Sequence, residues 1–449
     1  IRYIIFTVDE RIIVADRIIV EESSSIEESS SIEESSTEEG GGSEESSDIE
    51  ESSIDKDDSA YRDEERIDLN ALDGIIATNV KAKVYDGNAY APSIKVTVVK
   101  DRKKITLTEG TDYRVLYINN VNVGTGTVIV RGNGIYKGEI SKNFIINPKP
   151  VKKLKTITGG IEENTSLSDL SVLPIHVYDG TKLLQIGKDY MLSNYSMVKN
   201  TAKVSITGAG NYGGSVTVKL TVYKNDGKIM INPEDVTLNA EKAAYTGKAV
   251  KHIEPIVTVG GTELVKNKDY KIQYQNNKNA GSAFVIVTGK GGYKGKVIKS
   301  FEIMAETSGS IAIKPVSAKT YNGKLQKPTV TVSIQKDGKT KKLAKNKDYT
   351  ISYEDNLHAG NAKVIVKGRG NYEGLTVTGA FTIHPQKIAK ASVKGIQNSL
   401  VLTYSKRLLK EGTDYEPPVY GTENKNKVRV TIKGKGDFIG EVTKSVKVR

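Results

Sequence analysis

The sequence predicts an all-β protein built as a tandem array of five small antiparallel β-sandwich domains. Two observations lead to this fold class. An Asp-Tyr pair followed about twenty residues later by Gly-x-Gly-x-(Tyr/Phe)-x-Gly recurs five times along the 449 residues. From residue 71 onward, apolar residues alternate with polar ones at a spacing of two, which is typical of half-buried strands. The spacing of amphipathic helices is essentially absent.

The repeated motif sets the number and size of the domains. Successive Asp-Tyr pairs lie 77, 80, 79 and 66 residues apart, so each unit has the size of a small domain rather than of a solenoid coil. The five copies are Asp112, Tyr113, Gly132, Gly134, Tyr136 and Gly138; Asp189, Tyr190, Gly208, Gly210, Tyr212 and Gly214; Asp269, Tyr270, Gly289, Gly291, Tyr293 and Gly295; Asp348, Tyr349, Gly368, Gly370, Tyr372 and Gly374; and Asp414, Tyr415, Gly434, Gly436, Phe438 and Gly440.

These copies and the composition around them predict the domain boundaries. We number the repeats 1 to 5 in chain order. The predicted segments are an apolar segment at 1–20, an acidic Ser/Glu-rich linker at 21–70, repeat 1 at 71–149, repeat 2 at 150–226, repeat 3 at 227–307, repeat 4 at 308–386 and a shortened repeat 5 at 387–449.

The two N-terminal segments differ in character from the repeats. Charged residues interrupt the apolar segment 1–20, so it cannot span a membrane, and it lacks the features of a signal peptide. Because the chain begins with Ile rather than Met, we expect a fragment whose first residues are a remnant of an upstream domain. Residues 21–60 repeat Ile-Glu-Glu-Ser-Ser, with too few apolar side chains to form a core, and they predict a disordered tether.

Within a repeat, the strands and turns follow from the residue pattern. In repeat 3, Tyr270, Ile272 and Tyr274 alternate with polar residues, Asn276-Asn277 supplies turn chemistry, and Ala283, Val285 and Val287 return to a spacing of two. This pattern predicts a hairpin. We expect the second strand to continue through the following glycines, which indicate a bulge, a bend or a close backbone approach. Six or seven short strands per repeat fit a β-sandwich.

Each repeat is expected to open with Tyr-x-Gly and a later Pro. The openings are Tyr85, Gly87 and Pro92; Tyr245, Gly247 and Pro255; and Tyr321, Gly323 and Pro328. Repeat 2 keeps only Pro174, and repeat 5 has neither this opening nor an Asn-Gly turn of the same form. Between repeats, Pro148 and Pro150 restrict the backbone, whereas residues 306–310, Glu-Thr-Ser-Gly-Ser, predict a looser link.

This ordered pattern resembles the immunoglobulin-like tandem repeats of secreted and wall-attached proteins of Gram-positive bacteria, especially gut clostridia. The resemblance covers residues 71–449. It implies an array of five small Ig-like antiparallel β-sandwich domains, preceded here by the disordered acidic Ser-rich tether, at an extracellular or bacterial cell-surface location. The usual role of such repeats is that of a stalk, a spacer, an adhesive segment or an accessory region beside a catalytic domain.

The charge distribution bears on partners. Residues 1–70 contain 6 Lys and Arg against 23 Asp and Glu, whereas residues 71–449 contain 60 against 31. Such a basic array favours anionic cell-wall polymers or glycans. The alternative is that lysines on strand faces keep the protein soluble and block edge-to-edge pairing. Basic residues interleaved with exposed aromatics, or a recognition helix, are not visible, so no specific nucleic acid is expected as a partner.

The conspicuous motifs have structural explanations. The Asp of each Asp-Tyr pair is expected to accept hydrogen bonds from turn amides, and the Tyr to pack inward with a partner for its hydroxyl, as in the tyrosine corner of sandwich folds. The Gly-x-Gly motif is followed by a strand, whereas phosphate-binding loops need the start of a helix behind the glycines.

Residues for catalysis or metal binding are not evident. There is no Cys, which excludes disulfides and thiolate chemistry. His176, His252, His358 and His384 occupy non-equivalent positions, so they form no metal triad or acid-base pair. Turns such as Asn276-Asn277 offer oxygen ligands for calcium but lack the closely spaced acidic set of strong sites. We therefore predict no enzyme activity, no cofactor and no catalytic, cofactor-binding or metal-binding residue.

The sequence thus favours a non-catalytic extracellular stalk or adhesive repeat region of a bacterial surface or secreted protein, as a monomeric string of domains without a transmembrane segment. Two alternatives stay open. One is an accessory carbohydrate- or wall-binding region of a secreted hydrolase whose catalytic domain lies outside this chain. The other is an adhesin specific for a glycan or a host protein, for which the tyrosines outside the repeated motif are candidate ligand contacts: Tyr178, Tyr195, Tyr404 and Tyr420.

Overall fold

In the computed structural model, the described residues are 5–8, 11–14, 66–163, 165, 168–199, 201–405, 407–424 and 426–448. The predicted tether therefore lies almost entirely outside them. In the apolar N-terminal segment, β1 (Ile5–Val8) and β2 (Arg11–Val14) form an antiparallel hairpin with Ile5 opposite Val14. The remainder of the described chain is all-β, as predicted, with short 3₁₀ turns.

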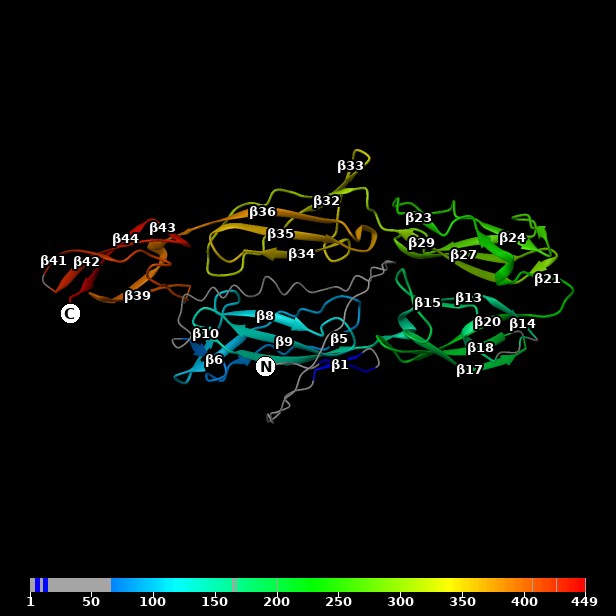
Figure 1. The fold of residues 1–449 in the computed structure, drawn as a ribbon, viewed down its shortest axis with the longest axis horizontal. Coiled ribbons are helices and arrows are strands. Elements are labelled where there is room, and N and C mark those ends of the chain that lie inside the picture. The colour runs from blue at the N-terminus through cyan, green and yellow to red at the C-terminus, as the bar shows by residue number, and fades with distance from the viewer. Residues whose placement is uncertain are drawn as a thin grey trace, which may run out of the picture. The chain divides into compact units, whose positions relative to one another are not determined.

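Repeat 1 contains a three-stranded sheet in the order β4-β6-β7 and a four-stranded sheet in the order β5-β11-β9-β8, drawn in blue to cyan in Figure 1. Its strands are β3 (Ile67–Asp68), β4 (Ile75–Ile76), β5 (Lys83–Val84), β6 (Val96–Lys100), β7 (Lys103–Thr106), β8 (Tyr113–Ile118), β9 (Gly124–Gly132), β10 (Tyr136–Lys137) and β11 (Glu139–Asn147). β3 lies before residue 71, the predicted start of the repeat, and pairs with β10. Val96 and Val98 of β6 share one buried cluster with Val128 and Val130 of β9, so the two sheets enclose the core.

Repeats 2 and 3 repeat this arrangement. The elements of repeat 2 are β12 (Lys149–Pro150), η3 (Val151–Lys153), β13 (Lys155–Thr158), β14 (Gly160–Glu162), η4 (Leu170–Val172), β15 (Ile175–Asp179), β16 (Lys182–Leu183), β17 (Tyr190–Val198), β18 (Thr201–Gly208), β19 (Tyr212–Gly213) and β20 (Ser215–Tyr223). Those of repeat 3 are β21 (Ile229–Met230), η5 (Pro233–Asp235), β22 (Val236–Leu238), β23 (Lys242–Ala244), β24 (Pro255–Val259), β25 (Thr262–Glu263), β26 (Tyr270–Gln275), β27 (Gly281–Gly289), β28 (Tyr293–Lys294) and β29 (Lys296–Met304). The sheet orders β13-β15-β16 with β14-β20-β18-β17, and β22-β24-β25 with β23-β29-β27-β26, match those of repeat 1.

Repeat 4 has the same two sheets, in the orders β30-β32-β33 and β31-β36-β35-β34. Its elements are β30 (Ser310–Ile313), β31 (Lys319–Thr320), β32 (Val332–Lys336), β33 (Lys339–Lys342), β34 (Tyr349–Glu354), β35 (Gly360–Gly368), η6 (Gly370–Tyr372) and β36 (Thr376–His384). Two sheets of three and four strands give the six or seven strands that the sequence predicts.

Repeat 5 differs in its pairing. Its elements are β37 (Gln386–Lys387), η7 (Ile388–Lys390), β38 (Ser392–Ile396), β39 (Ser399–Tyr404), β40 (Arg407–Leu408), β41 (Val419–Asn424), β42 (Lys427–Lys433), β43 (Phe438–Ile439) and β44 (Glu441–Lys447). A parallel bridge between Ile396 and Lys447 joins its strands into one six-stranded sheet, β40-β39-β38-β44-β42-β41. The shortened repeat thus connects the two layers that stay separate in the other repeats.

The alternation of the sequence explains which residues form the core. In β35, Ala362, Val364 and Val366 are fully buried, whereas Lys363 between them and Lys367 after them are exposed. The hairpin partner β34 places Tyr349 opposite Gly368 and Ile351 opposite Val366. The long strands of each repeat pair antiparallel, as predicted, and the short strand before each opening motif pairs in parallel with the last long strand, as β31 does with β36.

Candidate functional site at the junctions between repeats

The Asp-Tyr pair forms the same clamp in all five repeats, as predicted. Each carboxylate accepts a hydrogen bond from the backbone N–H four residues earlier. The bonds are Thr108 N to Asp112 at 2.7 Å, Gln185 N to Asp189 at 3.0 Å, Val265 N to Asp269 at 2.8 Å, Ala344 N to Asp348 at 2.9 Å and Lys410 N to Asp414 at 2.8 Å. Each aspartate therefore closes the loop that leads into the strand of the following tyrosine.

The tyrosine of each pair is buried, with an exposure of 3 to 6%. We predicted that the hydroxyl of this tyrosine would form a hydrogen bond, but among the described residues another tyrosine forms it. A second tyrosine, four residues further on in repeats 1, 3 and 4, donates to a backbone carbonyl across the sandwich: Tyr117 to Pro92 O, Tyr274 to Ile253 O and Tyr353 to Pro328 O. Because period two places residues i and i+4 on one face, this second ring lies nearer the edge where the opposite sheet offers a free carbonyl.

The glycines of the motif build a tight turn rather than a continuing strand. The preceding strand ends at or before the first glycine, which corrects the expectation that it continues. A Cβ on Gly132 would lie 2.7 Å from the backbone of Lys137, which is a close approach that only glycine permits. The second glycine has a positive φ of 55 to 65° in every repeat, which favours glycine.

This turn displays one residue immediately before the conserved aromatic, which we call the tip residue. The five tip residues are Ile135, Asn211, Gly292, Asn371 and Asp437. In every repeat the carbonyl of the tip residue accepts an N–H from the segment that enters the repeat, as in the bond from Glu306 N to Asn371 O at 2.8 Å. The turn therefore holds the entering chain and presents the tip side chain beside it.

At two junctions an asparagine tip binds the hairpin turn of the preceding repeat. Between repeats 1 and 2, Val123 N donates to Asn211 Oδ1 at 2.9 Å, and Asn211 Nδ2 donates to Asn122 Oδ1 at 3.0 Å. Between repeats 3 and 4 the same pair of bonds recurs. There, Ala280 N donates to Asn371 Oδ1 at 2.7 Å, and Asn371 Nδ2 donates to Asn279 Oδ1 at 3.1 Å.

The junction between repeats 4 and 5 keeps this geometry with different chemistry. Ala359 N donates to Asp437 Oδ1 at 2.7 Å, and Asp437 Oδ2 lies 2.8 Å from Nδ1 of His358. At the asparagine tips the second bond is donated by the tip amide, but an ionised carboxylate has no donor, so here the N–H has to come from the His358 ring. The substitution of both partners together preserves the two-bond contact.

An aromatic pair accompanies each of these three contacts. The opening tyrosine of one repeat packs edge-to-face on the aromatic residue that follows the tip of the next repeat. The ring centroids lie 5.7 Å apart for Tyr85 and Tyr212, 5.9 Å for Tyr245 and Tyr372, and 5.5 Å for Tyr321 and Phe438. Edge-to-face pairs contribute about 0.5–1.5 kcal/mol beyond the area that they bury.

The junction contacts account for the missing opening tyrosine of repeat 2. The backbone N–H of this tyrosine bonds to the last strand of its repeat, and the equivalent bonds in repeats 2 and 5 come from Glu163 and Gln397. Repeat 2 is followed by repeat 3, whose tip residue Gly292 has no side chain to bind a turn. Opening tyrosine and polar tip therefore occur together at three junctions and are both missing at the junction of repeats 2 and 3.

Charged groups tie the entering segments to the junctions. Lys149 pairs with Asp179, and Lys341 donates to the Tyr372 hydroxyl at 2.8 Å. The prediction of a loose link at 306–310 was wrong, because Glu306 is 5% exposed, accepts bonds from both N and Oγ of Ser308, and pairs with Lys336. The exposed residues are instead 224–229, between repeats 2 and 3.

The described groups do not form a catalytic arrangement. Burial raises the pKa of Tyr113 and of Tyr117 to about 12, so both hydroxyls stay protonated at neutral pH. Among the described residues, no three His, Asp or Glu side chains converge as metal ligands. None of the helical turns in the same residues has the length and apolar character needed to cross a membrane.

The four candidate ligand tyrosines lie apart, two in repeat 2 and two in repeat 5. Tyr178 is 2% exposed, and the hydroxyl of Tyr195 is buried without a hydrogen-bond partner among the described residues. Tyr404 is half-buried, accepts a bond from Gln386 and packs on Phe438, and half-buried Tyr420 accepts a bond from Asn398 N. A role of these residues in ligand binding stays a prediction.

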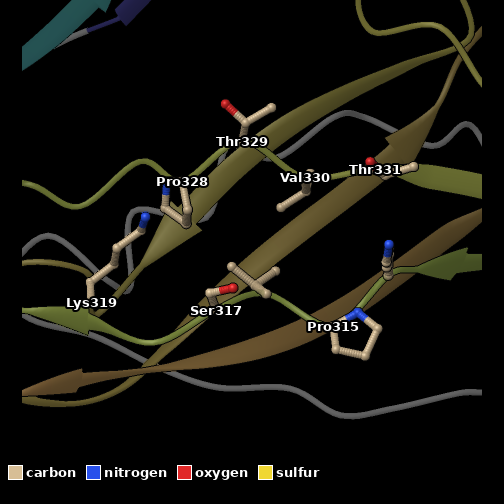
Figure 2. Close-up of a pocket in the computed structure, with 9 residues that line it drawn as sticks. Pro315, Ser317, Lys319, Pro328, Thr329, Val330 and Thr331 are labelled. Atoms are coloured by element: carbon tan, nitrogen blue, oxygen red, sulfur yellow. The ribbon is translucent and has the colours of Figure 1, made fainter.

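Repeat 4 also carries a cleft of about 310 Å³. Figure 2 shows Pro315, Ser317 and Lys319 on one extended segment and Pro328, Thr329, Val330 and Thr331 on another. In repeat 3 the side chain of Asn239 bridges the corresponding segments, by bonds to His252 O and from Glu254 N. Lys314 occupies the position of Asn239, since its N–H makes the equivalent backbone bond to Thr331 O. The cleft is thus the consequence of a missing bridge.

The chain matches no protein-family description and no curated protein, and its similarity to solved structures is low. Among solved structures, the chain is similar to the extracellular domain of protocadherin GammaB4, with 8% identity, 79% of this chain and 75% of that chain covered, and a TM-score of 0.15. Domains 4–9 of the surface layer protein SbsC match with 10% identity over 83% of this chain and 82% of that chain, at a TM-score of 0.17. Scores this low carry no argument about function.

Proposed function

We propose that this chain is a non-catalytic extracellular stalk or adhesive repeat region of a bacterial surface or secreted protein, in which the junctions hold consecutive repeats in fixed relative orientation. The observation that carries the proposal is the recurrence of one contact set, a bound tip residue and an edge-to-face aromatic pair, at three junctions. The sequence resemblance to wall-attached repeats supports the location.

The physical argument is that domains joined by a linker move relative to one another unless their contact is large or specific. Two hydrogen bonds, at about 1 kcal/mol each, and a buried ring pair restrict both bending and twisting at a junction. A catalytic protein does not need identical constraints at several junctions. A spacer does, because it must keep whatever it carries at a set place and angle.

The junction prediction is that Asn371→Gly, which installs the tip residue of repeat 3 in repeat 4, loosens the junction of repeats 3 and 4. The chain has no cysteine, so dyes can be placed on exposed positions by Thr262→Cys and Lys345→Cys. We expect single-molecule energy transfer to change from one narrow distribution to a broad one. The stability of repeats 3 and 4 should change by no more than about 1 kcal/mol.

The control for this variant is Asn346→Gly in the same repeat. Asn346 has a φ of 67°, a backbone conformation that glycine accepts without strain, and it lies in the loop before Asp348 rather than in the turn that carries the tip residue. This variant should keep the narrow distribution. An unchanged distribution in Asn371→Gly would show that the tip residue does not fix the junction, and the stalk proposal would lose its main support.

The net positive charge of the repeats favours a second role, attraction to anionic cell-wall polymers. We expect residues 71–449 in the full chain to bind poly(glycerol phosphate), with an affinity that falls at least about tenfold between 0.05 and 0.5 M NaCl, because exposed charges are screened at high salt. Binding to neutral dextran is the control. Affinity that persists at high salt would instead support a shaped site and the alternative of a specific adhesin.

A further inference from the structure

Repeat 3 has an apolar patch on the outward face of its four-stranded sheet. In β27, Ala283, Val285 and Val287 belong to the core of the repeat, as the alternation requires. Phe284 and Ile286 lie on the opposite face, with Ile298 of β29 paired to Ile286. These three side chains are 0, 4 and 7% exposed. Both faces of β27 are therefore buried.

The other repeats do not share this patch. Counting back from the first glycine of the motif, the position of Phe284 holds Thr127, Lys203, Lys363 or Arg429, and the position of Ile298 holds Ser141, Thr217, Thr378 or Thr443. The position of Ile286 holds Ile129, Ser205, Ile365 or Thr431, so Phe284 and Ile298 are what distinguish repeat 3. An outward face in this fold is normally polar. The apolar patch is a property of repeat 3 alone among the five, so the repeat architecture itself does not require it.

The cover on this patch comes from the three-stranded sheet of repeat 2. Tyr178 of β15, which is 2% exposed, stacks at an angle on Phe284 with ring centroids 5.5 Å apart, and Ile157 of β13 joins the same buried cluster. Repeats 1, 3 and 4 also have separate three- and four-stranded sheets, and at the position of Tyr178 they have Val99, Thr258 and Gln335. The two surfaces thus carry matching apolar substitutions.

Backbone and polar contacts surround the apolar centre. Ser282 N donates to Thr181 O at 2.8 Å, and Gln275 Nε2 donates to the hydroxyl of Tyr178. A Cβ on Gly281 would lie 2.6 Å from Thr181 Oγ1, so the backbones of the two repeats approach closely at this point. A buried apolar centre with a hydrogen-bonded rim is the anatomy of a specific interface.

We propose that the outward face of repeat 3, formed by Phe284, Ile286 and Ile298, is an interaction surface for the three-stranded sheet of repeat 2 of the same chain. Repeats 2 and 3 then associate laterally and reversibly, at the one junction that has neither an opening tyrosine nor a polar tip. The linking segment 224–229 is exposed, and it is held by bonds from Lys294 Nζ to Lys224 O and Asp226 and from Asn225 N to Glu163.

His176 makes the lateral contact sensitive to acid. Its ring packs edge-to-face on Phe284 at 5.7 Å, and its Nδ1 is buried with no hydrogen-bond partner among the described residues. Burial lowers the pKa of His176 below its ordinary value. His176 therefore takes up a proton more readily when the two repeats are separated than when they are in contact. The contact is strongest above about pH 6.5 and weakens as the pH falls below that value.

Other charges on the packed elements do not offset this effect. Burial alone is the cause of the shift at His176. The ionisable residues on these elements are Lys155 on β13, Tyr178 and Asp179 on β15, Lys182 on β16, Tyr270, Lys271 and Tyr274 on β26, and Lys296, Lys299 and Glu302 on β29. Asp179 pairs with Lys149 and Glu302 with Lys242, and burial lowers the pKa of Lys296, so this surface disfavours a further positive charge.

The test uses the full chain labelled through Lys182→Cys and Lys278→Cys, two exposed positions at the rim of the contact. At pH 7.5 we expect high energy transfer in the unsubstituted chain. We expect Phe284→Lys to abolish it; lysine is chosen because it is the residue of repeat 4 at this position. Tyr178→Thr, which takes the residue of repeat 3, should do the same from the other side. Lowering the pH to 5 should reduce transfer in the unsubstituted chain and leave it high in His176→Ser, which takes the residue of repeat 4.

Three results would overturn the proposal. One is high transfer in both Phe284→Lys and Tyr178→Thr while hydrogen exchange shows repeats 2 and 3 folded. Another is a pH response that persists in His176→Ser. The third is a mass of two chains by light scattering that falls to one chain in Phe284→Lys, which would assign the surface to a second copy of this chain.

Discussion

Replacing Asp414 with alanine should destabilise repeat 5 by about 3–5 kcal/mol, the range for removing one partner of a buried ion pair. Asp414 is 1% exposed. Both of its carboxylate oxygens contact Nη2 of Arg407, at 2.8 and 2.9 Å, and one also accepts the bond from Lys410 N. Without Asp414, the guanidinium loses its carboxylate partner in a largely buried site. Hydrogen exchange resolved by segment should show lost protection at 387–448.

The effect should extend across the junction to repeat 4. Nη1 of Arg407 donates at 2.9 Å to the hydroxyl of Tyr321, which is the opening tyrosine of repeat 4 and packs edge-to-face on Phe438. Arg407 therefore connects the loop clamp of repeat 5 with the aromatic pair of the junction. In Asp414→Ala we expect exchange to increase around Tyr321 as well, while repeats 1 to 3 stay protected.

The matched control is Asp348→Ala in repeat 4. Asp348 makes the same bond, from Ala344 N at 2.9 Å, but it is half-buried and has no arginine partner among the described residues. Its loss should cost about 1 kcal/mol, the contribution of one hydrogen bond. Equal destabilisation by the two substitutions would show that the backbone bond, and not the ion pair, accounts for the role of Asp414.

The sequence predicted much of what each repeat does within itself, although not the turn at the motif glycines or the hydroxyl partner of the paired tyrosine. The local signals are the spacing of two between apolar residues, the aspartate before a strand and the glycines at fixed positions. Each of them favours a particular local structure. The burial of Tyr349, the clamp by Asp348 and the close approach at Gly368 follow directly from them. Local chemistry decides these features, so they can be read without knowing what lies next to the repeat.

Contacts between repeats could not be predicted in the same way. Whether the polar residue before Tyr372 binds solvent or a neighbouring turn depends on a surface almost a hundred residues away in sequence. A signal was present, because the polar tip is missing in the repeat that follows the one without an opening tyrosine. The unbroken apolar run 283–287 was a second signal, since alternation predicts polar residues at 284 and 286. Both become informative only when the repeats are compared position by position.

The glycine turn connects the fold of a repeat to its junction, and this leads to the second large effect. A Cβ on Gly368 would lie 1.9 Å from Tyr372 O and 2.8 Å from Tyr372 C. Both are backbone atoms that no side-chain rotation can move away. Gly368→Ala should therefore destabilise repeat 4 by more than about 3 kcal/mol, at or beyond the upper end of ordinary overpacking. Thermal unfolding followed by segment-resolved hydrogen exchange would measure this loss.

The same substitution should also release the junction of repeats 3 and 4, because the displaced turn carries Asn371. Gly292→Ala is the matched control: it lies in the equivalent turn of repeat 3, and no heavy atom lies within 4 Å of the added Cβ. It should change stability by no more than about 0.5 kcal/mol. If Gly368→Ala were tolerated as well as Gly292→Ala, the close approach of the backbone would not be what requires glycine there. The turn that presents the tip residue would then owe its shape to the positive φ of Gly370 instead.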